Sequence, residues 1–193
     1  QIELWGEFDQ TTEKTAPERR DKIMELVHKC AALAAGLAPG SVQMLAMRNL
    51  IVSLGHHRDI LEYAYFSKSG DNTDKETGLD KASIVALAVR KQWASTDSSE
   101  LIVSQGHIRI PYGFKYHGMG ARLAVTPLTE KYYFAVSQAM QDVAVPIICG
   151  RQGTGKANLT RELAYEIGRE LLEYDCTAAF TAGDLERQLQ VAV

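Results

Sequence analysis

The sequence predicts an α/β protein in which a mostly helical first part with a short β-hairpin precedes a strand, a glycine-rich loop and a helix. Three observations support this fold class. Apolar residues recur at three- and four-residue spacing through the first half of the chain. Apolar and polar residues alternate near positions 101–110, which is typical of a hairpin. A glycine-rich loop at 150–157 then separates an apolar run from an amphipathic segment.

Two helices are expected in the first 65 residues. Pro17 suits the first turn of a helix with Thr15 as its cap, and an apolar stripe ends near Gly36. A second helical pattern begins near Ser41 and continues to Ala64. It contains adjacent histidines at 56 and 57, which lack a third ligand at helical spacing and therefore do not predict a metal site.

The next elements are a loop, a third helix and the hairpin. Residues 67–80 are polar and glycine-containing, so they predict a loop. A helix is expected from Asp80, as its cap, through Ile84 to Trp93. The hairpin then pairs residues 101–103 with residues 107–110 across a turn at Gln105 and Gly106.

The last third of the chain predicts a strand between two helices. Thr126 and Pro127 form a cap and a first-turn proline for a helix that continues to Met140. Residues 143–149 are an apolar run of strand length, and Pro146 favours an edge or irregular strand over a central one. After the loop, leucine or isoleucine recurs every four residues from Leu159 to Leu171 among charged residues, which predicts an amphipathic helix packed on a sheet.

The composition limits the classes of partner. The 193 residues are 46% hydrophobic and 23% charged, which is typical of a folded globular protein. The net charge of −3 gives no general positive field for nucleic acid or an anionic membrane, and no apolar stretch has the ~20 residues of a membrane span. We therefore expect neither partner.

The cysteines and the two ends of the chain indicate its setting. Cys30, Cys149 and Cys176 are far apart and odd in number, so they favour a reducing, cytoplasmic environment over a disulfide framework or a zinc site. Because the chain begins with Gln1 and stops abruptly at Val193, we expect it to be a piece of a longer protein.

The glycine-rich loop has the spacing of a phosphate-binding loop. Two glycines separated by four residues precede a lysine, so backbone N–H groups can converge on a phosphate without obstruction by Cβ atoms. The positive end of the following helix and the lysine ammonium add to this attraction. The predicted phosphate-binding residues are Gly150, Arg151, Gln152, Gly153, Thr154, Gly155, Lys156 and Ala157.

One position departs from the phosphate-binding motif. Ala157 stands where a serine or threonine hydroxyl normally binds Mg²⁺, and no acidic motif follows Lys156. We therefore assign no catalytic residue and no metal ligand, expect Mg²⁺ positioning to be impaired, and leave open whether the site hydrolyses ATP. A glycine turn with a solvated lysine remains the alternative interpretation of the loop.

Several motifs resemble the dynein heavy chain family. Residues 112–118 are similar to its Tyr-Gly-(Phe/Tyr)-x-Tyr-x-Gly segment, residues 126–129 to its Thr-Pro-Leu-Thr, and the glycine loop to its Gly-x-x-Gly-Thr-Gly-Lys, in the same order. Upstream, residues 54–60 are similar to a Leu-Val-His-Gln-Arg-Asp-Val segment of the family's linker. Residues 174–177 resemble a strand of the family and residues 185–193 the helix that follows.

The resemblance implies two parts with different roles. Residues 1–118 would be the C-terminal part of a dynein-like linker, and residues 119–193 the incomplete N-terminal part of a P-loop AAA+ module, truncated before its acidic motif. The adenine pocket would be formed by Val125, Thr126, Pro127 and Leu128. ATP would be the ligand, with Mg²⁺ in the family, and ATP binding would drive movement of the linker.

The same resemblance implies the cellular setting of the intact protein. It would be a cytoskeleton-associated microtubule motor, in the cytoplasm or in the axoneme of a cilium, with the rest of the motor ring, microtubules and dynein subunits as partners. Two other functions are considered beside it. A degenerate scaffold module would bind nucleotide without hydrolysis, whereas an unrelated small P-loop kinase or GTPase would leave the helical first half unexplained.

Overall fold

The computed structural model describes residues 6, 8–66, 80–94, 99–177 and 179–192. It is a mixed structure of helices and a small three-stranded sheet, consistent with the predicted α/β class. The elements are α2 (Ala16–Ala35), α3 (Val42–Tyr65), α4 (Lys81–Leu87), β1 (Arg90–Trp93), β2 (Leu101–Gln105), β3 (Ile108–Pro111), α5 (Pro127–Gln141), α6 (Lys156–Ile167) and α7 (Ala182–Ala192).

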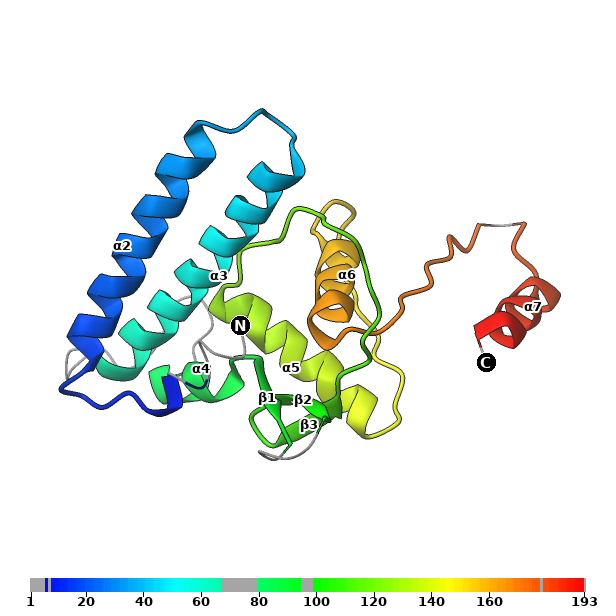
Figure 1. Ribbon diagram of the computed structural model, residues 1–193. Helices are drawn as coiled ribbons and strands as arrows, with labels where there is room; N and C mark the ends of the chain where they lie inside the picture. The colour runs from blue at the N-terminus through cyan, green and yellow to red at the C-terminus, as the bar shows by residue number, and fades with distance from the viewer. Residues whose placement is uncertain (1–5, 7, 67–79, 95–98, 178, 193) are drawn as a thin grey trace.

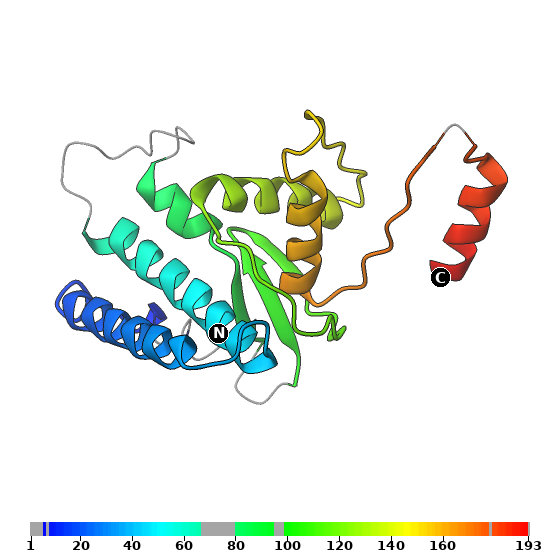
Figure 2. The ribbon, with the colours of Figure 1, turned by 90° about the horizontal axis from the view of Figure 1, so that it is seen from above.

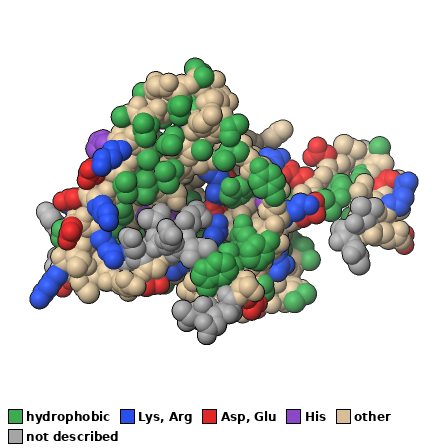
Figure 3. Space-filling view, viewed as in Figure 1, with side chains coloured by type: hydrophobic (Ala, Val, Ile, Leu, Met, Phe, Trp, Pro, Cys, Tyr) green, Lys and Arg blue, Asp and Glu red, His purple; other side chains and the backbone are tan. Residues whose placement is uncertain are grey.

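Figures 1 and 2 show how these elements are arranged. Helices α2 and α3 lie side by side as one layer, and α5 and α6 lie with the sheet beyond α3. Helix α7 stands apart at the end of an extended segment, as the ribbon views and the space-filling view of Figure 3 agree. Leu185 and Leu189 of α7 are accordingly exposed.

The two expected N-terminal helices are confirmed. Pro17 lies in the first turn of α2, and Ser41 caps α3 by accepting a hydrogen bond from the Met44 N–H at 3.2 Å. Thr15 precedes α2 but its side chain makes no cap hydrogen bond; its hydroxyl donates to the Thr12 carbonyl instead. The apolar stripes of the two helices form one core, which includes Ile23, Cys30, Leu54, Ile60 and Leu61. Burial of these facing stripes is what holds the layer together.

The third helix is shorter than the sequence predicts. Helix α4 ends at Leu87, and residues 90–93 form β1 instead of continuing the helix to Trp93. Strand β1 pairs antiparallel with β2, so that Trp93 lies opposite Leu101, and β2 pairs antiparallel with β3. The backbone groups of residues 90–93 therefore form their hydrogen bonds with β2. Such pairing depends on tertiary structure and cannot be predicted from the local spacing of apolar residues. Residues 67–79 of the predicted loop at 67–80 fall outside the described residues.

The hairpin of residues 101–110 and the helix that begins at Thr126 are confirmed. In β2 and β3 the residues alternate between buried and less buried positions, as the sequence pattern predicts. Gly106 makes the tight turn with a φ of 59°. The Thr126 hydroxyl caps α5 by accepting from the Thr129 N–H at 3.3 Å, and Pro127 is the first residue of the helix.

Residues 143–149 are not a strand, so that prediction is wrong. They run as an irregular segment, and Val143, Val145 and Ile147 are each more than 85% exposed. In the described part of the chain the only sheet consists of β1, β2 and β3, and no strand lies beside this segment to accept its hydrogen bonds. An apolar run forms a stable strand only when a neighbour pairs with it. Residues 174–177, expected as a strand from the family resemblance, are likewise irregular.

Helix α6 also ends earlier than predicted. It stops at Ile167, because Gly168 adopts a left-handed conformation with a φ of 65°, and Leu171 therefore lies outside it. Its apolar face packs mainly on α5 and on one strand of the hairpin, as Leu163 and Ile167 join Tyr133, Val136 and Val103 in a second core. None of the described helices is long and apolar enough to cross a membrane.

Candidate functional site

The predicted phosphate-binding residues form one continuous loop that leads into α6. Gly153 and Gly155 have φ values of 80° and 85°, a conformation that side chains other than glycine rarely adopt. Gly155 occupies the N-cap position of α6 and supplies no capping side chain. The N–H groups of the first turn of a helix have no partners within the helix, so they can serve an anion.

Lys156 closes this loop. Its ammonium donates to the carbonyl oxygens of Gly150 at 2.9 Å and Arg151 at 2.7 Å. The Thr154 hydroxyl donates to the same Arg151 carbonyl at 2.9 Å. The ammonium is therefore held over the bend at the point where the loop meets the helix. That geometry suits a phosphate group, which the lysine could contact by exchanging its carbonyl partners for phosphate oxygens.

The residues around position 157 do not fit a Mg²⁺ ligand. Ala157 has no oxygen in its side chain, and the nearby side-chain oxygens have other partners. The Asn158 oxygen accepts from Arg161 at 2.7 Å. The Thr160 hydroxyl donates to the Lys156 carbonyl at 3.0 Å and lies 2.7 Å from the Tyr132 hydroxyl. Among the described residues, moreover, no group of three or more His, Cys, Asp and Glu side chains could hold a metal.

The four predicted adenine-pocket residues lie at the entrance to α5. Thr126 is its cap, Pro127 begins it, and Leu128 is 59% exposed. Val125 lines a cavity whose lining includes no residue of the glycine loop. The Tyr132 and Thr160 hydroxyls, 2.7 Å apart, join α5 to α6, but neither residue belongs to the predicted site.

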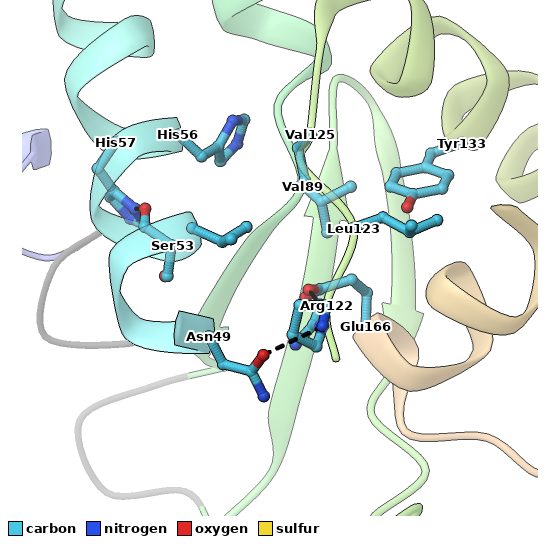
Figure 4. A pocket seen from close by; sticks show the side chains of 11 residues that line it. Asn49, Ser53, His56, His57, Val89, Arg122, Leu123, Val125, Tyr133 and Glu166 are labelled. Atoms are coloured by element: carbon cyan, nitrogen blue, oxygen red, sulfur yellow. Dashed lines mark hydrogen bonds and ion pairs between the residues drawn. The ribbon is translucent and has the colours of Figure 1, made fainter. Parts of the chain in front are cut away.

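That cavity, of about 40 Å³, lies between α3, Val89 just before β1, α5, α6 and the segment leading into α5 (Figure 4). Asn49 of α3 binds the backbone of this segment with both ends of its amide. It donates to the Gly120 carbonyl at 2.8 Å and accepts from the Arg122 N–H at 3.0 Å. The α2–α3 layer is thereby attached to the segment that separates the two predicted parts of the chain.

Four buried charged side chains lie beside the contact between α3 and the segment leading into α5. Arg122 contacts the carboxylates of Glu162 and Glu166 on α6, and Lys91 of β1 lies 2.7 Å from the other oxygen of Glu166. Each of these four side chains is about nine-tenths buried. The Arg122 guanidinium also lies 4.0 Å from the centre of the Tyr165 ring. Two positive and two negative charges balance here, as burial requires. We call this set the buried charge cluster.

Burial lowers the pKa of two basic side chains in this part of the structure, Lys91 and His57. It lowers the pKa of Lys91 to about 8, and the nearby Arg122 charge acts in the same direction. Burial also lowers the pKa of His57 to about 4, while the hydrogen bond between its Nδ1 and the Ser53 carbonyl, at 2.8 Å, opposes this shift. His57 is therefore neutral at pH 7 and donates from Nδ1.

Residues 112–118, which follow β3, cover the C-terminal end of α6. The Gly113 N–H donates to the Ile167 carbonyl at 3.0 Å, and the Lys115 N–H donates to the Gly168 carbonyl at 2.7 Å. A Cβ atom at Gly113 would lie 2.5 Å from the Gly168 oxygen, so only glycine fits. The segment thus caps the C-terminal end of α6, whose N-terminal end carries the glycine loop.

Sequence reasoning missed the buried charge cluster. The amphipathic pattern of α6 predicts Glu162 and Glu166 on its solvated face, yet they lie against Arg122 in the interior. Their positions, each directly before an apolar residue of the stripe, were the available signal, because such residues border the buried face of a helix. The partners Lys91 and Arg122 are distant in sequence, and no local pattern predicts them.

Comparison with known proteins agrees with the resemblance. Residues 112–190 match a family model described as the hydrolytic ATP-binding site of the dynein motor region. The chain is homologous to dynein heavy chains. The match begins at the segment that caps α6 and includes α5, the glycine loop, α6 and most of α7. All the predicted phosphate-binding and adenine-pocket residues therefore fall within the matched part of this dynein-related chain.

Individual dynein heavy chains extend the similarity upstream. The flagellar outer-arm dynein alpha chain of Chlamydomonas reinhardtii is 33% identical over 108 residues, 51% of this chain and 2% of its own length. Cytoplasmic dynein heavy chain of Paramecium tetraurelia is 27% identical over 134 residues, 68% and 3% of the two chains. Axonemal dynein heavy chain 2 of mouse is 26% identical over 166 residues, 84% and 4% of the two chains. The chain thus spans only 2–4% of the length of these relatives.

Proposed function

We propose that this chain is the part of a dynein-like microtubule motor that joins the end of the linker to the first AAA+ module and binds ATP at the glycine loop. The single observation that supports phosphate binding best is the loop itself. Two glycines with positive φ lead into α6, and Lys156 is held over the bend. In this proposal residues 150–157 hold the phosphates, and Val125, Thr126, Pro127 and Leu128 border the adenine.

The proposed division of the chain places the linker part in residues 1–118 and the AAA+ part in residues 119–193. The contacts of Asn49 with residues 120 and 122 support a boundary in this segment, because they attach a helical layer to a chain that then enters α5. In the intact motor, ATP binding would shift the linker, and the other parts of the ring, microtubules and dynein subunits would be its partners. A cytoskeletal or axonemal location follows from the same proposal.

Nucleotide titration of the chain tests ATP binding. We expect a fluorescent ATP analogue to bind the wild-type chain and Lys156→Ala to weaken binding at least about tenfold, because the charge that faces the phosphates is lost. Arg169→Ala is a suitable control, because Arg169 is an exposed cation beyond the other end of α6. Equal affinities of the wild type and Lys156→Ala would contradict phosphate recognition at this loop.

The alternative function, a nucleotide-binding scaffold module without hydrolysis, is favoured by one observation. Ala157 has no hydroxyl, and the oxygens of Asn158 and Thr160 have other partners. If this function is correct, removal of Mg²⁺ with a chelator leaves the nucleotide affinity nearly unchanged. Ala157→Thr should then create a dependence on Mg²⁺, since it supplies the missing ligand oxygen. A strong Mg²⁺ dependence of the wild type would contradict the scaffold function.

A further inference from the structure

The helix that carries the glycine loop is held in the interior by charge rather than by apolar contacts alone. Glu162 and Glu166 lie roughly two and three turns along α6 after Lys156, on the side facing Arg122. Arg122 contacts both carboxylates and lies over Tyr165 of the same helix. One side chain from outside the helix therefore contacts three positions of α6.

A second contact extends this attachment to the sheet. Lys91 of β1 binds the Glu166 oxygen that Arg122 leaves accessible, at 2.7 Å. Arg122 also donates its backbone N–H to Asn49, so Arg122 joins α3 to α6, while Glu166 joins α6 to β1 through Lys91. Figure 4 shows Arg122, Glu166 and Asn49 together on one side of the cavity.

We propose that Arg122 is a positioning residue for the glycine loop. By bridging Glu162 and Glu166 it sets the orientation of α6 against β1 and α3, and so the orientation of the loop at the start of α6. The predicted effect of Arg122 on nucleotide binding rests on the proposed function, whereas its effect on the loop does not. Breaking a buried bridge leaves an uncompensated charge, whereas breaking an exposed pair costs little. The effect on the loop should therefore be specific to the buried charge cluster.

The chain offers a matched control on the same helix. Arg161 of α6 forms an ion pair with Glu173 at 2.5 Å, and both side chains are about half exposed. Glu162→Gln and Glu173→Gln make the same chemical change, one in the buried charge cluster and one at the surface. Arg122→Lys keeps the positive charge but replaces the two-armed guanidinium with a single ammonium, which cannot bridge both carboxylates equally.

The test is hydrogen exchange of the ligand-free 193-residue chain, followed by mass spectrometry of peptides that contain residues 150–158. We expect Glu162→Gln and Arg122→Lys to accelerate exchange in this loop about tenfold, while exchange in the core of α3 stays as in the wild type. Glu173→Gln should leave both regions unchanged. Unaltered loop exchange in Glu162→Gln would overturn the proposal, and that variant decides the outcome even if Arg122→Lys does not fold.

A second measurement separates this proposal from the proposed function. With a fluorescent ATP analogue, the two cluster variants should bind about three- to tenfold more weakly than the wild type, and Glu173→Gln should bind equally. If the wild type binds and Lys156→Ala does not, but the cluster variants bind normally, Arg122 does not position the loop and the proposed function stands. If the wild type does not bind, the proposed function fails, and hydrogen exchange alone decides the positioning role.

Discussion

The Nε2 atom of His56 on α3 lies 3.1 Å from the Oε1 atom of Glu130 on α5, and both side chains are almost fully buried. The other oxygen of Glu130 and its backbone carbonyl accept from the Gln105 amide at 3.3 Å and 3.0 Å. Gln105 also donates to the Leu87 carbonyl at 2.7 Å. A single acidic residue therefore connects the helical layer, the hairpin and the second core.

This connection predicts strong coupling between His56 and Glu130. His56→Ala and Glu130→Ala should each lower the free energy of unfolding by about 2–4 kcal/mol, because each leaves a buried polar partner unsatisfied. In the double variant the loss should fall short of the sum by about 1 kcal/mol or more. Urea denaturation measures all three values. Glu25→Ala, which breaks an exposed ion pair on α2, serves as the control and should cause no detectable change. Additive losses in the double variant would show that His56 and Glu130 act independently.

The Tyr133 hydroxyl has no hydrogen-bond partner among the described residues, although the residue is only 1% exposed. Burial and the nearby carboxylates of Glu162 and Glu130 raise the pKa of this phenol. Tyr133→Phe should therefore leave the free energy of unfolding unchanged or raise it by about 1 kcal/mol, since it removes an unsatisfied polar group and keeps the ring. Thermal or urea denaturation measures the change, and a loss of about 1 kcal/mol or more would reveal a bonded hydroxyl, for example to a water in the cavity.

The buried His57 predicts how stability depends on pH. Its pKa is lowered to about 4 in the folded chain, against 6.5 when exposed, so the unfolded chain binds a proton more readily between these values. The contribution of neutral His57 to the free energy of unfolding is therefore complete above pH 6.5 and is lost as the pH falls toward 4. The difference is about 3 kcal/mol. The amide introduced by His57→Asn can still donate to the Ser53 carbonyl and does not titrate. The stability difference between wild type and variant should therefore change across pH 4–6.5, and parallel curves would refute the role of His57.

Gly113 is predicted to tolerate no side chain. In Gly113→Ala the Cβ atom would lie 2.5 Å from the backbone oxygen of Gly168, and relief of this contact would break the hydrogen bond to Ile167. We expect a loss of roughly 2 kcal/mol or more in the free energy of unfolding. Gly120→Ala is the control, because a Cβ atom at Gly120 meets nothing within 4 Å. Equal stabilities of the two variants would show that the contact relaxes without cost.

The sequence predicted those elements whose signals are local. Ser41 and Thr126 cap helices as expected, and the alternation in β2 and β3 matches the hairpin. The predictions of a strand at 143–149 and of a helix through Trp93 were wrong. Strand formation depends on a neighbouring strand to pair with, and the local spacing of apolar residues does not reveal that neighbour. The family resemblance was predicted from motif order and is confirmed by comparison. The site residues were also named from these motifs, and their role in binding ATP remains a prediction.

The amino-acid order by itself determined the glycine loop and the absence of a hydroxyl at Ala157, since both are properties of a few consecutive residues. Only the tertiary structure decided that Glu162 and Glu166 face Arg122 and Lys91 rather than solvent. The physical reason is that a buried charge is tolerated only beside an opposite charge. Those opposite charges come from residues far away in the chain, on β1 and on the segment before α5, which meet α6 only when the sheet, α5 and this segment have packed around it.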